Sequence, residues 1–447
     1  MQSACNDWTE SDDCIYGDIL PHNPATYHCL PYGTIVIDDI RLNILGNGPG
    51  HHPDRTDDIG NLPVYKIQII LEKLTNQMMK TYFLTSLSLL LSAFILTAKT
   101  STSTIPASDT RIEYTGRILK CGDCVTYDWS GVYLRVKFTG TRLSIKCSDT
   151  KGDWFNYWID KEMEPVEDGK VHICSKDTTI VLAKGLKKGT HEIILQKRTE
   201  AEQGRFTAIS FECDGEFLQA DGRKGRHIEF IGDSYTCGYG TESDNRDDPF
   251  KAETENCNLT YAAIASRYFG ADYTLVSHSG QGISRNYDDY RSGYHMPDRY
   301  LNTFDEAQET ENVKWDPSSV DTLPDIVVIY LCTNDFSTGR QPHFKSFLSN
   351  YKALLSMIKA NYSEDIPVLC LASKANPDCA TYIKRVCEEC GLKNVYWTAM
   401  TEMVHNEDSE LGASWHPNYK GHKKVASCVI PYIFTITGWE MEEKPYR

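Results

Sequence analysis

The chain has 447 residues, which is longer than most single domains and predicts two or three folded units. Hydrophobic residues make up 40% of it and charged residues 24%, a composition that excludes a wholly disordered or fibrous chain. The formal net charge of −16 argues against a nucleic-acid-binding protein, because such a protein needs a basic surface to neutralise phosphates.

A segment typical of secretion begins at two consecutive methionines, Met78 and Met79. Lys80 follows them, and then an uncharged apolar run over residues 83–98, which together form the pattern of a secretory signal peptide. The run is shorter than the roughly 20 residues with which a helix spans a bilayer. We therefore expect a signal peptide over residues 78–99 and a secreted or periplasmic protein. No stable membrane association is expected after cleavage.

The residues before this segment, 1–77, show little sustained hydrophobic periodicity. A signal peptide normally stands at the start of a chain, so we interpret residues 1–77 as an extension upstream of a translation start at Met78 or Met79. If residues 1–77 are part of the protein, the apolar run becomes a membrane anchor instead.

Residues 108–222 have the pattern of an all-β domain. Short stretches that alternate apolar and polar residues, such as Val132–Phe138 and Arg142–Lys146, are separated by turn formers such as Thr139-Gly140. Turn signals recur along the whole region without a long helical period. This pattern predicts a β-sandwich or a jelly roll.

Residues 226–440 alternate apolar strands with amphipathic helices, which predicts an α/β domain with a parallel sheet and helices on both faces. In such folds, ligands bind beyond the carboxyl ends of the strands. The strands are expected at Ile228–Ile231, Tyr273–Ser277, Ile326–Leu331, Val368–Leu371 and Val395–Trp397, and the helices over 257–268, 343–360, 379–390 and 418–430.

Residues that can do chemistry follow the expected strands. The first strand runs into Gly232-Asp233-Ser234, and a Ser on a tight turn after a buried strand is exposed as a nucleophile. The second runs into Ser279-Gly280, where a small residue can offer its backbone N–H. The third runs into Asn334-Asp335, which offers a side-chain amide, and Trp415-His416 precedes the last expected helix. Four such pieces in order indicate one site at the strand ends.

This order of blocks resembles the SGNH (GDSL-type) esterase superfamily, with Ser234, Gly280, Asn334 and His416 in its four blocks. The Gly238-Tyr239-Gly240 extension and the preceding β-domain resemble carbohydrate esterase family two more narrowly. That family removes acetyl groups from plant polysaccharides such as xylan and glucomannan. The resemblance implies a flavodoxin-like hydrolase domain preceded by a jelly roll.

The resemblance also implies a mechanism. Ser234 and His416 would be the catalytic residues, the serine attacking an ester carbonyl while the histidine takes its proton. The oxyanion hole would be formed by the backbone N–H groups of Ser234 and Gly280 and by the Asn334 side chain. No cofactor and no metal are implied. The expected partner is an acetylated polysaccharide or oligosaccharide, and no nucleic acid.

Two positions depart from the family pattern. Cys332 stands where the third block usually begins with Gly, and we expect it to fit that turn with a negative φ. Ala413 stands where the superfamily often has an Asp three residues before the His. We expect a Ser–His dyad whose imidazole is oriented by a backbone carbonyl. The alternative is that Asp408 or Glu410 completes a triad.

Three further residues are candidates for binding substrate. Trp415 is either a wall of a sugar cleft or a packing residue, and Asp335 positions either a substrate hydroxyl or the Asn334 loop. Tyr239 lies beside the nucleophile block and is expected to line the pocket. Two other functions remain open: an SGNH esterase or lipase acting on small acyl or lipid esters, and an inactive carbohydrate-binding protein.

Overall fold

The computed structural model describes residues 36–37, 40–41, 72–86, 102–289, 294–306, 313–320, 322–374, 376–401 and 404–441. The chain divides into two compact units, Met1–Phe94 and Ile95–Arg447. The first contains the paired strands β1 (Val36–Ile37) and β2 (Ile40–Arg41) and a helix over residues 72–86.

That helix includes the first residues of the expected signal peptide. The rest of this segment, residues 87–99, and most of the expected extension 1–77 lie outside the described residues. Both assignments therefore stay predictions. Among the described residues, none of the helices has the length and apolar character needed to cross a bilayer.

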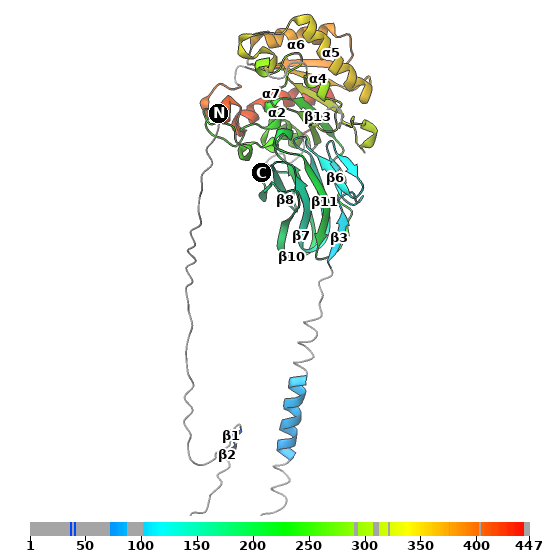
Figure 1. Cartoon of the computed structure of the whole chain (residues 1–447), viewed down its shortest axis with the longest axis vertical. Helices are drawn as coiled ribbons and strands as arrows, with labels where there is room; N and C mark the ends of the chain where they lie inside the picture. The colour runs from blue at the N-terminus through cyan, green and yellow to red at the C-terminus, as the bar shows by residue number, and fades with distance from the viewer. Residues whose placement is uncertain are drawn as a thin grey trace, which may run out of the picture. The chain divides into compact units, whose positions relative to one another are not determined.

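The second unit begins with a β-domain, as the alternating pattern predicts, and its ten strands form one hydrogen-bonded sheet system. The strands, cyan to green in Figure 1, lie on the side of this unit opposite helices α5 (Phe344–Asn361) and α6 (Pro377–Glu389). They are β3 (Ser103–Pro106), β4 (Glu113–Thr115), β5 (Leu119–Cys121), β6 (Cys124–Tyr127), β7 (Tyr133–Asp149), β8 (Asp153–Ile159), β9 (Gly169–Ile173), β10 (Thr178–Lys197), β11 (Phe206–Cys213) and β12 (Phe217–Leu218).

The two longest strands correct one sequence expectation. Thr139-Gly140 does not separate two strands, because β7 continues through it for 17 residues and pairs antiparallel with the 20-residue β10. Gly140 has φ +132°, and a Cβ there would meet the Asp214 carboxylate. The glycine therefore bends a continuous strand, and the pairing register shifts in the same part of β10, between Lys184 and Gly189.

The α/β domain has the expected five-stranded parallel sheet, in the order β14-β13-β15-β16-β17. This is the 2-1-3-4-5 order of flavodoxin-like folds, in which the first strand lies inside the sheet and its carboxyl end faces a ligand crevice. The strands are β13 (His227–Gly232), β14 (Asp272–Ser277), β15 (Ile326–Tyr330), β16 (Val368–Ala372) and β17 (Val395–Ala399).

Alternating side chains of these strands fill two separate cores. Ile231 and Ile329 pack in the core that contains residues of α5 and α6, whereas Phe230 packs with α3 (Tyr261–Tyr268) and α7 (Tyr419–Thr437). The remaining described α-helices of this domain are the short α2 (Ser234–Cys237) and α4 (Met296–Arg299). The prediction of helices on both faces is confirmed, because uniformly apolar strands need cover on each side.

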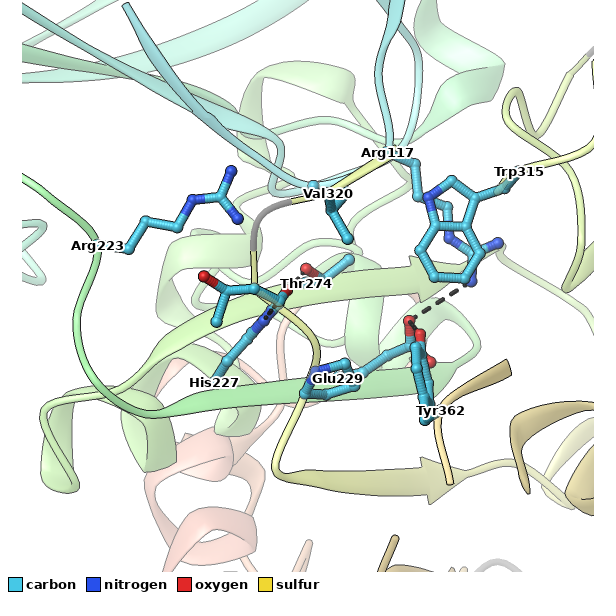
Figure 2. A pocket seen from close by; sticks show the side chains of 11 residues that line it. Arg117, Arg223, His227, Glu229, Thr274, Trp315, Val320 and Tyr362 are labelled. Carbon is cyan, nitrogen blue, oxygen red and sulfur yellow. Dashed lines mark hydrogen bonds and ion pairs between the residues drawn. The ribbon is translucent and has the colours of Figure 1, made fainter. Parts of the chain in front are cut away.

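A buried cation from the β-domain joins the two domains at the amino end of the sheet. Figure 2 shows the Arg117 side chain reaching beside Trp315 toward the carboxylate of Glu229 on β13. The guanidinium lies 4.2 Å from the centroid of the Trp315 ring and 3.4 Å from the Glu229 oxygen. Glu229 also accepts hydrogen bonds from the hydroxyls of Tyr300 at 3.0 Å and Tyr362 at 2.8 Å.

The pocket around this pair has a volume of only about 20 Å³, and His227, the first residue of β13, helps to line it. That volume suits a water molecule rather than a sugar. The pocket is also at the opposite end of β13 from Ser234, so it belongs to the domain interface rather than to a substrate site.

We expect Arg117→Ala to lower the free energy of unfolding by about 3–5 kcal/mol, because it leaves the buried Glu229 carboxylate without its cation. Urea denaturation measures the change. The matched control is Arg111→Ala, which breaks a half-exposed ion pair with Asp109 in the same domain and costs less than about 1 kcal/mol. Equal losses in the two variants would contradict a special role for the buried pair.

Candidate active site

Ser234 begins helix α2 directly after β13, on the tight turn that the sequence predicts. Asp233 is the N-cap of this helix, and its carboxylate accepts a hydrogen bond from the backbone N–H of Tyr235 at 3.1 Å. Gly238 ends the helix with φ +89°, and a Cβ at this position would lie 2.6 Å from the backbone of Asn256. A glycine is therefore required for the four-residue helix to end where it does.

The fold brings Ser234 and His416 together from opposite ends of the domain. The Nε2 atom of His416 lies 2.8 Å from the Ser234 Oγ, and its Nδ1 atom lies 3.0 Å from the carbonyl oxygen of Ser414. A carbonyl oxygen can only accept, so Nδ1 carries the proton and the basic Nε2 faces the hydroxyl. This is the arrangement of a nucleophile with its general base.

The carbonyl reaches the imidazole because the chain makes a left-handed turn. Ser414 has φ +52° and Trp415 has φ +65°, a conformation that L-residues adopt at a cost. The neighbouring loop holds this turn, since the N–H groups of Ser414 and Trp415 donate to the carbonyls of Asp248 at 2.9 Å and Arg246 at 3.1 Å.

Neither candidate carboxylate touches His416 in the described part of the chain. Asp408 is exposed and forms an ion pair with Arg246, while Glu410 is buried against Lys424. Ala413 gives no carboxylate, and its Cβ would lie 2.6 Å from a Cβ built on Gly240, so it contacts the loop after α2. Of the two arrangements that the sequence left open, the geometry is that of the dyad.

Aromatic rings surround the imidazole of His416. Tyr239 stacks on it with the ring centroids 4.2 Å apart, and Phe250 stacks on the other side of Tyr239 at the same distance. Tyr235 meets the imidazole edge-on at 5.5 Å. This burial disfavours the charged form and lowers the pKa of His416 to about 4. Tyr239 therefore lies against the base, which the sequence did not predict.

Hydrogen bonds bring the three expected oxyanion-hole blocks to one place. The Asn334 side-chain amide donates to the Asp233 carboxylate at 3.1 Å and to the Gln281 carbonyl at 2.8 Å, so it is tied to the neighbours of both Ser234 and Gly280. Among the described residues, none accepts a hydrogen bond from the backbone N–H of Ser234 or of Gly280. Both groups remain available to an anion.

Burial raises the pKa of Asp233 to about 7, and the nearby carboxylate of Asp335 adds to the shift. The carboxylate makes one hydrogen bond to Tyr235 and one to Asn334, which oppose this shift only in part. Asp233 is thus a structural link between the nucleophile turn and the amide of Asn334.

The structure corrects the expected conformation of Cys332. Its φ is +96°, in the region that favours glycine, rather than negative. The residue is completely buried, and its carbonyl oxygen lies 3.7 Å from the thiol of Cys379 on α6. The turn between β15 and Asn334 needs a positive φ, which explains why the family usually has a glycine at this position. Cys332 adopts the same backbone conformation, but with strain.

The structure also corrects the assignment of Asp335 as a substrate-binding residue. Its carboxylate is completely buried and accepts hydrogen bonds from the backbone N–H groups of Ile283, Ser284 and Arg285 at 2.9, 2.8 and 3.0 Å. With no exposed surface it cannot meet a sugar hydroxyl. Its side chain instead fixes the segment that follows Gly280.

Trp415 lies at the open side of the site. Its side chain is 55% exposed, and the guanidinium of Arg246 stacks on its ring at 4.0 Å. Together with Tyr235 and His405 it lines a pocket of about 400 Å³. Neither Arg246 nor His405 could be identified from the sequence, because both lie in loops outside the motif blocks.

A group of side chains near Gly280 has the spacing of metal ligands, namely Glu202, His278 and Glu306. The His278 imidazole lies 2.6 Å from the Asp305 carboxylate. Burial alone would lower its pKa, but Asp305 outweighs that effect and raises the pKa to about 9. Without a metal ion, this group is therefore an ion-pair network around a protonated imidazole at neutral pH.

Two family descriptions match adjacent parts of the chain. "Carbohydrate esterase 2 N-terminal" covers residues 114–220, and "GDSL-like Lipase/Acylhydrolase" covers residues 228–429. The boundary between them separates the β-domain from the α/β domain described above.

Three relatives illustrate the similarity. Cellulase/esterase CelE of Acetivibrio thermocellus is 32% identical over 318 residues, which is 70% of this chain and only 38% of that protein. The acetylxylan esterase/glucomannan deacetylase of Cellvibrio japonicus is 28% identical over 69% of this chain and 85% of its own length. A family two carbohydrate esterase from Clostridium thermocellum, solved in complex with cellohexaose, is 30% identical with a TM-score of 0.67, covering 73% of this chain and 99% of that one.

The lowered pKa of His416 predicts the pH dependence of an ester-cleaving reaction. A general base works only when unprotonated, so activity is present above the pKa and is lost as the pH falls through it. We expect the acid limb of kcat/KM for p-nitrophenyl acetate to lie well below the usual histidine value of about 6.5. Circular dichroism at each pH separates this limb from unfolding. Because the pKa of Asp233 is itself raised to about 7, the same pH profile is recorded for the Asp233→Asn variant. An acid limb at or above pH 6.5 that persists in this variant would contradict the expectation.

The contacts of Asp408 predict that the site works without a carboxylate on the histidine. We expect Asp408→Asn to keep kcat within about threefold of the wild type, because Asp408 pairs with Arg246 and not with His416. A carboxylate that orients a catalytic histidine is worth about 10⁴-fold in kcat where it exists. Steady-state kinetics on p-nitrophenyl acetate distinguish the dyad from the triad. A loss of 100-fold or more in kcat for Asp408→Asn would favour the triad.

Proposed function

The chain belongs to carbohydrate esterase family two, a family of carboxylic ester hydrolases, and from this premise we propose that it is an exported serine esterase that removes acetyl groups from plant polysaccharides. The observation that carries the proposal is the 2.8 Å contact between Ser234 Oγ and His416 Nε2 at the carboxyl end of β13. The match of 318 residues spans only 38% of the relative CelE, so the proposal concerns the two domains described here.

The reaction has two steps. In the first, Ser234 Oγ forms a bond to the acetyl carbonyl carbon while His416 Nε2 takes the hydroxyl proton, and the bond to the sugar oxygen then breaks as that proton passes to it. In the second, water attacks the acetyl-serine ester, giving its proton through His416 back to Ser234. The products are the free sugar hydroxyl and acetic acid, so atoms and charges balance.

The negative charge on the tetrahedral oxygen is held by three donors in this proposal. They are the backbone N–H groups of Ser234 and Gly280, which donate to no described residue, and the Asn334 amide. Both N–H groups of that amide donate within the protein, to Asp233 at 3.1 Å and to the Gln281 carbonyl at 2.8 Å, so one of them must turn to the oxyanion as it forms. Removing one donor of this kind typically costs roughly 100–1000-fold in rate. The Ser414 carbonyl keeps the imidazole in the productive tautomer at both steps.

The carbohydrate class of the substrate is supported by the relatives and by the open side of the site. The Cellvibrio japonicus relative is named an acetylxylan esterase and glucomannan deacetylase, and the Clostridium thermocellum structure contains cellohexaose. Trp415 is an exposed aromatic surface on which a sugar ring can stack. The pocket beside it is lined by Arg246, Lys374 and Asp408, a charged lining that disfavours a lipid chain.

The β-domain is proposed to be a jelly roll in which the long bent strands β7 and β10 run through the middle of the sheet. The bend at Gly140 supports this arrangement, because a strand of 17 residues must curve to close a small barrel or sandwich. Export through the signal-like segment at Met78 is part of the same proposal, since the polysaccharide lies outside the cell.

We expect Ser234→Ala to reduce acetate release from acetylated xylan by at least about 1000-fold, because the bond-forming oxygen is removed. Acetate is measured enzymatically, and p-nitrophenyl acetate and p-nitrophenyl palmitate are assayed in parallel. The control is Ser346→Ala, at an exposed serine on α5, which keeps full activity. Unchanged acetate release in Ser234→Ala would overturn the assignment of Ser234 as the nucleophile. Activity restricted to the palmitate ester would move the assignment to a lipase.

A further inference from the structure

A carboxylate from the β-domain reaches the loop that carries Gly280. Glu200 follows the end of strand β10 and is only 1% exposed. Its Oε2 atom accepts a hydrogen bond from the backbone N–H of Ser279 at 2.8 Å. Ser279 immediately precedes Gly280, so a residue outside the hydrolase domain contacts one of the proposed oxyanion-hole blocks.

The same oxygen also contacts the helix that begins with Ser234. The thiol of Cys237, the last residue of α2, lies 3.6 Å from Glu200 Oε2 and donates a weak hydrogen bond to it. One oxygen atom thus joins the element that carries the nucleophile to the loop that carries the Gly280 donor.

Glu200 is itself held firmly. Its backbone N–H donates to the Glu255 carboxylate at 3.1 Å, and its carbonyl oxygen accepts from the Lys197 ammonium at 3.1 Å. Burial raises the pKa of Glu255 well above its ordinary value, and the neighbouring carboxylate of Glu200 adds to the shift.

We propose that Glu200 is a positioning residue for the oxyanion hole, holding the Ser279–Gly280 backbone so that the Gly280 N–H faces the reacting ester. The inference rests on the proposed function. Gly280 has φ +77°, and only the Cβ of Tyr287, at 3.7 Å, would contact a Cβ built there, so neighbouring side chains do little to fix this peptide. The Ser279 hydrogen bond supplies an anchor one residue away. The β-domain is then part of the catalytic unit.

A second observation supports a role in orientation rather than in folding alone. The rest of the Gly280 segment is held from the other side, because Gly280 O accepts from Tyr287 N at 2.8 Å and Ile283 N donates to Asp335. Losing Glu200 therefore frees the His278–Ser279 peptide, which directly precedes the peptide that carries the Gly280 N–H, without releasing the loop. A small displacement of the Gly280 N–H from the position of the oxyanion is expected to lower kcat while leaving KM nearly unchanged.

The test uses the full chain and three substitutions at one position. Glu200→Ala removes the acceptor, Glu200→Asp keeps the charge but withdraws the oxygen by one methylene, and Glu200→Gln keeps a carbonyl acceptor at the original reach. The matched control is Glu229→Ala, which removes an equally buried carboxylate from the same domain interface at the opposite end of β13. Each variant is assayed with p-nitrophenyl acetate beside wild type and Ser234→Ala.

We expect Glu200→Ala and Glu200→Asp to lose about 10–100-fold in kcat with KM within about threefold, a fraction of the loss from deleting a donor outright. Glu200→Gln should recover to within about fivefold of the wild type. Inhibition by phenylboronic acid, which forms a tetrahedral adduct on the serine oxygen, should weaken in the Ala and Asp variants by the same factor as kcat. Glu229→Ala should lower the melting temperature but not kcat.

The outcomes separate the two proposals. Activity that survives Ser234→Ala overturns the proposed function itself. With Ser234-dependent activity established, a wild-type kcat in Glu200→Asp, or an equal loss in Glu200→Gln and Glu200→Asp, overturns the positioning role. An equal loss of kcat in Glu229→Ala would do the same, because it would assign the effect to interface stability. If Glu200→Ala does not fold, the Asp and Gln variants decide the question.

Discussion

The orientation of one imidazole is the constraint on which the rest of the site depends. In the described part of the chain, the Nδ1 atom of His416 donates to a neutral carbonyl, that of Ser414, at 3.0 Å, and no carboxylate contacts the ring. A carbonyl fixes the tautomer as a carboxylate does, but it adds no charge to stabilise an imidazolium. Other contacts must therefore hold the ring, and the stacked pair of Tyr239 and Phe250 does so from one face. The low pKa of about 4 follows from the same enclosure without a countercharge.

Three residues of the site have strained backbone conformations. Cys332, Ser414 and Trp415 all have positive φ although none is glycine. Each such residue costs of order 1–3 kcal/mol and persists only where its surroundings over-determine it. For Ser414 and Trp415 the surroundings are the carbonyls of Asp248 and Arg246, which accept their N–H groups. The strain is the means by which a short loop turns its carbonyl back onto the histidine.

The two domains are joined by buried polar groups at both ends of strand β13. At the amino end, Arg117 meets Glu229 between aromatic rings, and beyond the carboxyl end Glu200 meets the N–H of Ser279. Buried charged groups are stable only in well-formed networks, so each contact specifies one arrangement of the domains. In our proposal, the β-domain therefore supports the loop that carries Gly280.

The amino-acid sequence by itself determined the elements and their order. Uniformly apolar runs such as Ile326–Leu331 predict buried strands, and in a parallel sheet the carboxyl ends of the strands meet at one edge, which placed Ser234, Gly280 and Asn334 together. His416 could be identified because its block follows the last strand in the family order. These inferences depend on local pattern, which the chain carries in its primary structure.

The tertiary structure alone decided the partners of these residues. The roles of Asp335, Asp408 and Glu410 were ambiguous because sequence spacing does not say which way a loop side chain points. The positive φ of Cys332 was missed because the strain is compensated by packing against a distant helix. Glu200 carried no signal at all, since its contact with Ser279 joins positions 79 residues apart across two domains. Contacts of that kind depend on how the domains dock, and docking is a property of the folded molecule.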